Sequence, residues 1–279
     1  IVGVVTAIGK NVSKFKIGDR AGVGCMVDGC TTCEEEQYED GTKFTYGYAD
    51  EREPTKITQG GYSTHIVVNN HFAVHIPNNL SFEKAAPLLC AGITTYSPIM
   101  KAQINKGDKV AVAGIGGLGH MAVKLAVSKG AEVYAFTTSA DKVKDIKAFG
   151  AKEVIVVDNK EKFLAYQGQM DYMISTIPYQ FDVASYASVV KPYGFFTQVG
   201  MPENFQITLN NLGLSVSRVN FNASLIGGMK ETQEMINYCA KNNVLPEIQI
   251  IKADEINQAW KNVENKKARY RYVIDIATI

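Results

Sequence analysis

The sequence predicts an α/β fold in which a doubly wound parallel sheet is joined to a mostly-β domain. From about residue 82 onward, short β-branched runs alternate with segments of helix length, which is the pattern of parallel strands connected by helical crossovers. The first ninety residues differ, because Gly, Asn and Pro punctuate their β-branched runs without a helix between them. A glycine-rich turn also follows one of the alternating strands and opens a helix.

In the first ninety residues we expect strands at 1–9, 62–69 and 72–76, and a long loop between Cys30 and Gly61. A helical segment over 82–100 leads into the alternating region. The predicted strands of that region are 109–113, 132–136, 154–157, 171–175, 195–199 and 222–226. The predicted helices between them are 119–129, 141–149 and 181–191. After Gly228 the pattern predicts a helix at 229–242, a strand at 247–251, a helix at 254–265 and a strand at 270–276.

Composition excludes several classes of protein. The 279 residues are 46% hydrophobic, which is ample for a core, and 29 basic against 28 acidic side chains leave a net charge of +1. We therefore expect no nucleic-acid partner and no anionic membrane partner. No apolar run approaches the ~18 residues of a membrane span. Five cysteines are too few for a disulfide scaffold of this size, which favours a reducing compartment, the cytoplasm.

The strongest motif is the run from Gly114 to Gly119, which directly follows the strand at 109–113. Its spacing, Gly114-x-Gly116-x-x-Gly119, is the dinucleotide fingerprint in its usual context between a strand and a helix. The alternative is a plain tight turn. The residues expected to hold the pyrophosphate are Gly114, Ile115, Gly116, Gly117, Leu118 and Gly119.

The strand at 132–136 indicates which dinucleotide binds. NAD sites place an acidic residue about 20 residues beyond the glycines, but this strand is followed by Thr137, Thr138 and Ser139, with Lys142 close behind. Three hydroxyl groups and a lysine suit the 2′-phosphate of NADP. Ser139 or Thr138 could also cap the helix that begins near Asp141, and the two interpretations are compatible.

The cysteines divide into two groups. Cys30 and Cys33 form a Cys-x2-Cys pair that could hold zinc or could be a chance pair in a loop, because Glu36 stands at the next step and no further cysteine precedes Cys90. Cys25 and Cys239 lie in apolar surroundings and are expected to be buried thiols. By periodicity alone, Cys90 is also a buried helix thiol.

The sequence resembles the zinc-dependent medium-chain alcohol dehydrogenases of the cinnamyl alcohol dehydrogenase branch, over essentially the whole chain. The resemblance rests on six ordered segments: VSKFKIGDRAGVGCMVDGC (12–30), GGYSTHIVV (60–68), AAPLLCAGITTYSP (85–98), GIGGLGHMAVKLA (114–126), SLIGGMKETQEM (224–235) and RYRYVIDI (269–276). It implies an NADP-binding Rossmann domain at 91–228. It also implies an N-terminally incomplete GroES-like catalytic domain at 1–90, to which 229–279 return.

The resemblance also implies an activity and a set of site residues. The activity is the reversible oxidation of primary alcohols to aldehydes with NADP(H) and Zn2+, in a homodimer, with a cinnamyl-type or broad substrate range. Cys90 corresponds to a catalytic zinc ligand, and Thr94 to a residue at the nicotinamide. Cys30 and Cys33 correspond to two ligands of a structural zinc. The remaining cofactor contacts implied are Thr176, Gly200, Ser224, Leu225 and Ile226.

The chain opens at Ile1 inside a predicted strand, and the family's other catalytic zinc ligands come from motifs ahead of that strand. We expect those motifs to exist upstream. Two alternatives stay open on the sequence alone: a zinc-free reductase of the wider family, and a non-catalytic NADP-binding remnant.

Overall fold

The computed structural model describes residues 1–32 and 42–279. The chain divides into two compact units, one made of Ile1–Ile93 with Ile226–Ile279 and the other of Thr94–Leu225. The chain therefore leaves the first unit once and returns to it. No helix in the described parts of the chain is long and apolar enough to cross a bilayer.

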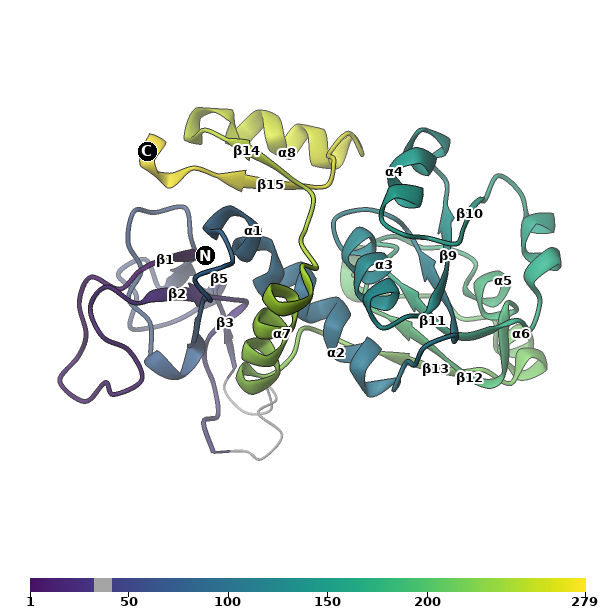
Figure 1. Ribbon diagram of the computed structural model, residues 1–279, viewed down its shortest axis with the longest axis horizontal. Helices are drawn as coiled ribbons and strands as arrows, with labels where there is room; N and C mark the ends of the chain where they lie inside the picture. Colours follow the sequence, from purple (N-terminus) through teal and green to yellow (C-terminus); the bar gives the residue numbers. More distant parts are fainter. Residues whose placement is uncertain (33–41) are drawn as a thin grey trace. The chain divides into compact units, whose positions relative to one another are not determined.

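The unit Thr94–Leu225 is built on a six-stranded parallel sheet with the strand order β10-β9-β8-β11-β12-β13 (Figure 1). The strands are β8 (Lys109–Ala113), β9 (Glu132–Thr137), β10 (Glu153–Val156), β11 (Met170–Ser175), β12 (Val190–Gln198) and β13 (Asn220–Ala223). The helices are α2 (Ile93–Lys101), α3 (Gly119–Ser128), α4 (Val143–Ala148), α5 (Val183–Ala187) and α6 (Asn211–Ser217). The strand order reverses between β8 and β11, so their carboxyl ends form the topological switch point where such sheets bind ligands.

Aromatic side chains fill one face of this sheet. Phe136 of β9 stacks on Phe163 with ring centroids 5.7 Å apart, and the edge of Tyr186 meets both rings. Phe136 and Phe196 are fully buried, and burial of each such side chain contributes about 1.5–3 kcal/mol. This packing holds the sheet, and with it the loops at the carboxyl ends of the strands, in one arrangement.

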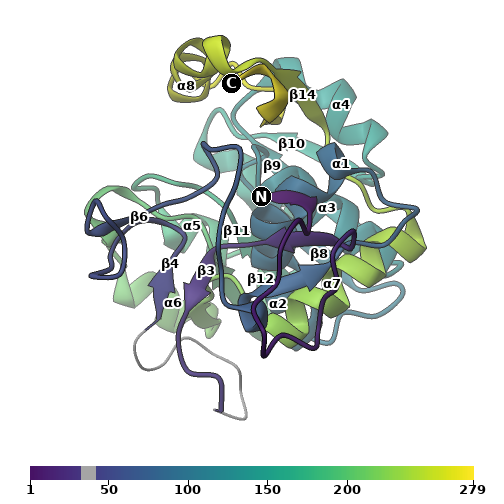
Figure 2. The ribbon, with the colours of Figure 1, turned by 90° about the vertical axis from the view of Figure 1, so that its left-hand side faces the viewer.

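The other unit contains short antiparallel strands. Strands β1 (Val2–Val4), β2 (Arg20–Val23) and β7 (Ala73–His75) form one sheet. Two smaller pairs join β3 (Met26–Asp28) to β4 (Lys43–Phe44) and β5 (Tyr46–Ala49) to β6 (Ile57–Gln59) (Figure 2). This mostly-β architecture confirms the predicted GroES-like domain.

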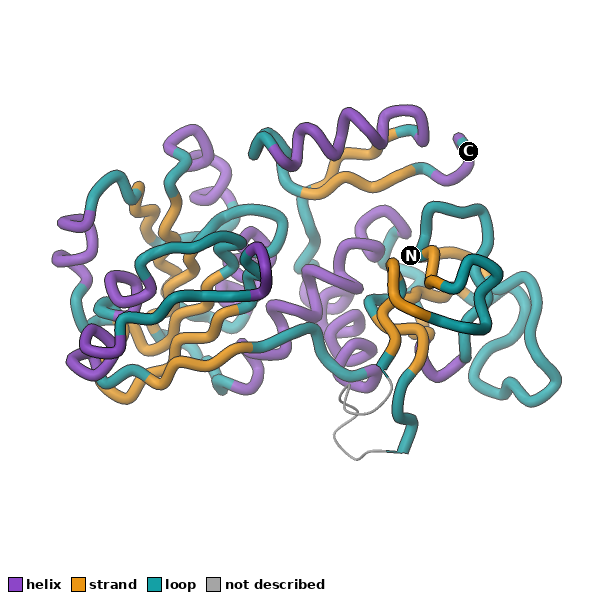
Figure 3. The backbone as a smooth tube through the Cα atoms, turned by 180° about the vertical axis from the view of Figure 1, so that it is seen from behind, coloured by secondary structure: helices purple, strands orange, loops and turns teal. Residues whose placement is uncertain are grey.

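The C-terminal segment of this unit adds α7 (Met229–Asn242), the parallel pair β14 (Ile248–Ile251) and β15 (Arg271–Ile274), and α8 (Ile256–Glu264) (Figure 3). It is tied to the first segment by side-chain hydrogen bonds. Gln233 of α7 exchanges two with the backbone of His75, and Lys84 of α1 (Phe82–Pro87) donates to the carbonyl of Pro246. The short helical turns of the chain are η1 (Asn70–Phe72), η2 (Leu88–Gly92), η3 (Ala140–Lys142), η4 (Lys160–Tyr166), η5 (Glu203–Phe205), η6 (Ala253–Glu255) and η7 (Ile276–Thr278).

Several predicted elements were wrong. The segment 62–69 is not a strand, although Ile66 and Val68 face the core and Val67 is exposed. Its start folds locally instead, because Ser63 accepts from the amide of His65 and donates to its carbonyl. The stretch between Cys30 and Gly61 contains β4, β5 and β6 rather than loop alone, and β1 is shorter than 1–9.

Two further differences lie in the sheet unit. The helix expected at 181–191 ends at Ala187, because the carbonyl of Val189 accepts from the amide of Met170 and Val190 pairs with Met170 to begin β12. The last strand, β13, begins at Asn220 rather than 222 and ends at Ala223, and helix α6 was not predicted.

Candidate functional site

The glycine-rich turn leaves the carboxyl end of β8, at the switch point. Gly114 has φ +80°, a conformation that favours glycine, and its amide donates to the carbonyl of Phe136 on β9. Gly119 begins α3, where a Cβ atom would lie 2.0 Å from the carbonyl oxygen of Gly114. At Gly116 a Cβ would have no atom within 4 Å. The turn therefore presents open backbone at Gly116 and a close helix contact at Gly119, which is the division of roles that a pyrophosphate site requires.

Thr176 fixes this turn to the neighbouring strand. Its hydroxyl donates to the carbonyl of Gly114 over 2.5 Å, and its amide donates to the carbonyl of Ala113 over 2.8 Å. Thr176 follows β11 directly and is buried. The predicted cofactor residue Thr176 thus contacts the glycine turn through its side chain.

The residues after β9 carry no carboxylate until Asp141, and their hydroxyl groups are not all used internally. Thr138 is exposed, and Ser139 stands at an N-cap position without a side-chain capping bond, so the capping alternative is wrong for Ser139. Thr137 is buried and accepts from the amide of Ser139. Lys142 is buried, and its Nζ donates to the carbonyl of Ile115 over 3.3 Å. A cation therefore lies beside the glycine turn, and two hydroxyl residues precede it in sequence, which suits a 2′-phosphate.

Gly200 and the residues after β13 lie at the same edge of the sheet. A Cβ on Gly200 would lie 2.2 Å from the carbonyl oxygen of Ile177, so only glycine fits there. The amide of Ser224 donates to Gln198. Leu225 is the last residue of this unit, and Ile226, which is buried with φ 40°, is the first of the returning segment.

Cys90 lies in the π-helical turn η2, one turn before the buried Thr94 of α2. Cys25, between β2 and β3, has its Sγ 3.7 Å from the carbonyl oxygen of Leu89. A hydrogen bond from the Cys25 thiol, together with the charge of Arg271, lowers the pKa of Cys90 to about 6. The same bond and burial raise the pKa of Cys25. Cys90 therefore has the thiolate character of a metal ligand, and Cys25 keeps its proton.

These sulfur atoms do not form a complete zinc site by themselves. Within residues 1–32 and 42–279, no group of three His, Cys, Asp or Glu side chains is placed to hold a metal, whereas a catalytic zinc takes three protein ligands. Contrary to prediction Cys90 is exposed and Cys25 only half-buried, whereas Cys239 is buried as predicted.

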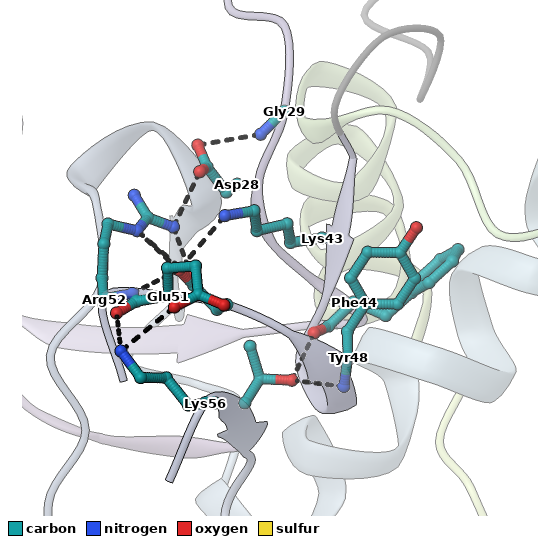
Figure 4. A network of polar contacts seen from close by, with 10 residues as sticks. Asp28, Gly29, Lys43, Phe44, Tyr48, Glu51, Arg52 and Lys56 are labelled. Carbon is teal, nitrogen blue, oxygen red and sulfur yellow. Dashed lines mark hydrogen bonds and ion pairs between the residues drawn. The ribbon is translucent and has the colours of Figure 1, made fainter. Parts of the chain in front are cut away.

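The second predicted metal pair is only partly described. Cys30 lies 3.6 Å from the hydroxyl of Thr32, and both Cys33 and Glu36 lie outside the described residues. Residues that precede and follow 33–41 in the sequence form an ion-pair network centred on the buried carboxylate of Asp50 (Figure 4). Asp50 accepts from Lys43 over 3.1 Å and from Arg52 over 2.6 Å, and Arg52 reaches Asp28 over 2.7 Å. The hydrogen bonds from Arg52 hold the pKa of Asp50 below its ordinary range.

Sequence reasoning missed this network and also Gln198, whose side chain bridges two loops of the glycine-turn edge. The charged run at 50–53 was visible in the sequence, but Asp28 and Lys43, which complete the network, lie on the strands β3 and β4. For Gln198, the available signal was a glutamine within the predicted strand at 195–199, which is otherwise mostly apolar.

Comparison with known proteins shows the family to which the chain belongs. The family described as "Alcohol dehydrogenase GroES-like domain" matches residues 1–78, and "Zinc-binding dehydrogenase" matches residues 117–241. NADP-dependent alcohol dehydrogenase C 1 of Mycolicibacterium smegmatis is 43% identical over all of this chain and 81% of its own length. Aldehyde reductase YahK of Escherichia coli is 41% identical with the same coverage.

Solved structures give the same result. The cinnamyl alcohol dehydrogenase of Helicobacter pylori, complexed with NADP(H), superposes with a TM-score of 0.92 at 40% identity, covering 99% of this chain and 80% of that one. A cinnamyl alcohol dehydrogenase of Sorghum bicolor gives a TM-score of 0.93 at 33% identity, with the same coverage. The fold is that of a dinucleotide-dependent oxidoreductase. The chain belongs to the zinc-type medium-chain alcohol dehydrogenases.

Proposed function

We propose that this chain interconverts primary alcohols and aldehydes with NADP(H), using the glycine turn at Gly114–Gly119 to hold the cofactor. The main support for the proposal is the set of residues at the carboxyl edge of the six-stranded sheet. An open backbone turn at Gly116 lies beside a cation, Lys142, and β9 ends in hydroxyl residues rather than a carboxylate. The relatives named above as NADP-dependent alcohol dehydrogenase and aldehyde reductase support the activity, and Zn2+ is the metal of this family.

In this proposal the residues of the chain bind and orient. The amides at the start of α3 and the open backbone at Gly116 receive the pyrophosphate, while Lys142, Thr138 and Ser139 receive the 2′-phosphate. Thr94 borders the nicotinamide. The bound cofactor supplies a hydride for the carbonyl carbon. Cys90 is proposed as one of the family's zinc ligands.

Reduction of an aromatic aldehyde with NADPH and with NADH tests this function. Lys142→Ala should raise the KM for NADPH about tenfold or more, because a charge-assisted hydrogen bond contributes about 1.5–3 kcal/mol, and should leave the KM for NADH unchanged. Lys144→Ala, which removes an exposed lysine of α4, is the matched control and should change neither. Equal use of both cofactors by the wild-type protein would contradict the NADP assignment. Activity that survives zinc chelation would instead favour the zinc-free reductase.

We also propose that two copies form a homodimer through β13, the edge strand of the six-stranded sheet. Edge strands offer unpaired backbone groups for another chain. The nearby helix α6 exposes Leu212 and Val216, one turn apart, and buries none of its side chains. Light scattering should give twice the chain mass of 30.5 kDa, and Asn222→Pro should give the single mass. A wild-type monomer would refute this arrangement.

A cytoplasmic location is proposed from the thiols. Cys25 and Cys90 lie in hydrogen-bond contact without forming a disulfide, a state that a reducing compartment maintains. Recovery of the protein in the fraction that carries cytoplasmic marker enzymes tests this proposal, and recovery elsewhere would oppose it.

A further inference from the structure

Gln198 is a buried polar side chain at the carboxyl end of β12. Its relative exposure is 6%. Its Nε2 donates to the carbonyl of Ile177 over 3.0 Å and to the carbonyl of Gly200 over 2.8 Å. One amide group thus connects the loop after β11 with the loop after β12.

The orientation of this amide is fixed by its partners, because only the NH2 group can face two carbonyl oxygens. Its Oε1 is therefore left buried without a hydrogen-bond partner among the described residues. Ser175 is the register partner of Gln198 on β11, and its hydroxyl is likewise buried without a partner in the described structure. Unsatisfied buried polar atoms cost stability, so a glutamine here is not explained by packing.

The two loops joined by Gln198 are continuous with the glycine turn. Gly200 lies so close to Ile177 that a Cβ would be 2.2 Å from its carbonyl oxygen. Thr176, the residue before Ile177, donates to the carbonyl of Gly114. Close backbone contacts and three side-chain hydrogen bonds therefore run from Gln198 to the start of the glycine turn, all within one compact unit.

We propose that Gln198 is a positioning residue for NADP(H), holding the carboxyl ends of β11 and β12 at the spacing that the cofactor needs before it binds. The proposal rests on the proposed function of this edge of the sheet. Loops that are already ordered lose less conformational entropy on binding, so the benefit falls on cofactor affinity rather than on the chemical step.

Gln198→Met tests the proposal, because methionine has a similar length and no hydrogen-bond donor. The dissociation constant and the KM for NADPH should both rise about tenfold, the scale of one to two lost hydrogen bonds. The kcat at saturating NADPH should stay within about twofold. Gln198→Asn, which keeps the amide but reaches at most one carbonyl, should give a smaller rise.

The matched control is Gln180→Met. Gln180 also connects the loop after β11 with the loop after β12, donating to the carbonyl of Gln206 and accepting from the amide of Thr208, but it is exposed and bonds neither Ile177 nor Gly200. Its replacement should lower the thermal unfolding midpoint and leave NADPH affinity unchanged. Wild-type NADPH affinity in Gln198→Met, or an equal loss of affinity in Gln180→Met, would overturn the proposal.

Hydrogen exchange on the wild-type protein gives a test that needs no variant. The amides of Val199 and Gly200 both donate to the carbonyl of Ser175, and they should be protected before NADPH is added. Protection that develops only with NADPH would refute pre-ordering. If the wild-type protein fails to bind NADPH at all, the proposed function fails first, and the two failures are thus distinguishable.

Discussion

Three glycines at one edge of the sheet are required for different physical reasons. Gly114 has a positive φ, Gly119 allows α3 to begin against the carbonyl of Gly114, and Gly116 leaves open space. The first two serve the folded chain itself, whereas the third serves a ligand. Substitutions should therefore separate folding from binding within six residues.

We expect Gly119→Ala to destabilise the free protein by about 1–3 kcal/mol, because its Cβ would overlap a backbone oxygen that cannot easily move. Gly116→Ala should change the free energy of unfolding by less than about 0.5 kcal/mol. Gly116→Ala should nonetheless weaken NADPH binding about tenfold or more, since the added methyl fills the space kept for the pyrophosphate. Thermal unfolding without cofactor and fluorescence titration with NADPH measure the two effects. Equal destabilisation by both variants would contradict this division of roles.

At the scale of residues, the sequence predicted those features of the cofactor site that depend on residues close together in the chain. The spacing of the glycines and the missing carboxylate after β9 are both visible within short windows, and the structure places Thr176 against the turn as well. The contacts of Gln198, Asp50 and Cys25 were not predictable, because each depends on which distant segments meet. No periodicity in the chain reveals that Lys142 donates to Ile115 or that Cys25 donates to Cys90.

At the scale of elements, the Asp50 network joins β3, β4 and the β5–β6 hairpin, which are too short to be stable alone. Asp28 and Lys43 are paired across β3 and β4, and Arg52 and Asp50 lie in the turn between β5 and β6. Ion pairs around a buried carboxylate thus supply order to a region whose sequence offers few apolar side chains.

The network should make this region sensitive to acid. Because the folded-state pKa of Asp50 lies below the unfolded value of about 3.9, its stabilisation is fully present above that pH and is lost as pH falls through the folded pKa. Asp50→Asn should therefore lower the thermal midpoint by a constant amount between about pH 5 and 7, and this difference should shrink below about pH 4.

The control for this prediction is Glu51→Gln, which breaks the exposed pair between Glu51 and Lys56. Exposed pairs contribute about 0–1 kcal/mol, so little change is expected. An Asp50→Asn difference that does not shrink at all between pH 5 and pH 3, or one matched by Glu51→Gln, would show that the network is not the cause.

Helices and strands were predictable from the sequence where the pattern of apolar residues matches the packing in the folded protein. Helix α7 occupies 229–242 as expected, and the helical segment over 82–100 forms α1, η2 and α2. The segment 62–69 has the correct alternation of buried and exposed residues but lacks a hydrogen-bonded neighbour, and alternation alone does not supply one. The short strands β4 to β6 were missed because their polar sequence has no sustained period.

At the scale of the whole molecule, the chain builds one unit, crosses into the second at Thr94 and returns at Ile226. Several predicted site residues stand close to these two crossings in sequence: Cys90 and Thr94 at the first, and Ser224, Leu225 and Ile226 at the second. A doubly wound parallel sheet could be predicted from the alternation of strands and helices, but its strand order was not predicted. The return of the C-terminal segment to the first unit was implied only by family resemblance.

The most direct test of the account is an equilibrium titration of the wild-type protein with NADPH and with NADH, followed by cofactor fluorescence at one fixed ionic strength. The account predicts that NADPH binds at least about tenfold more tightly, because a 2′-phosphate gains charge-assisted hydrogen bonds beside Lys142. Equal or tighter binding of NADH, or the binding of neither, would contradict it.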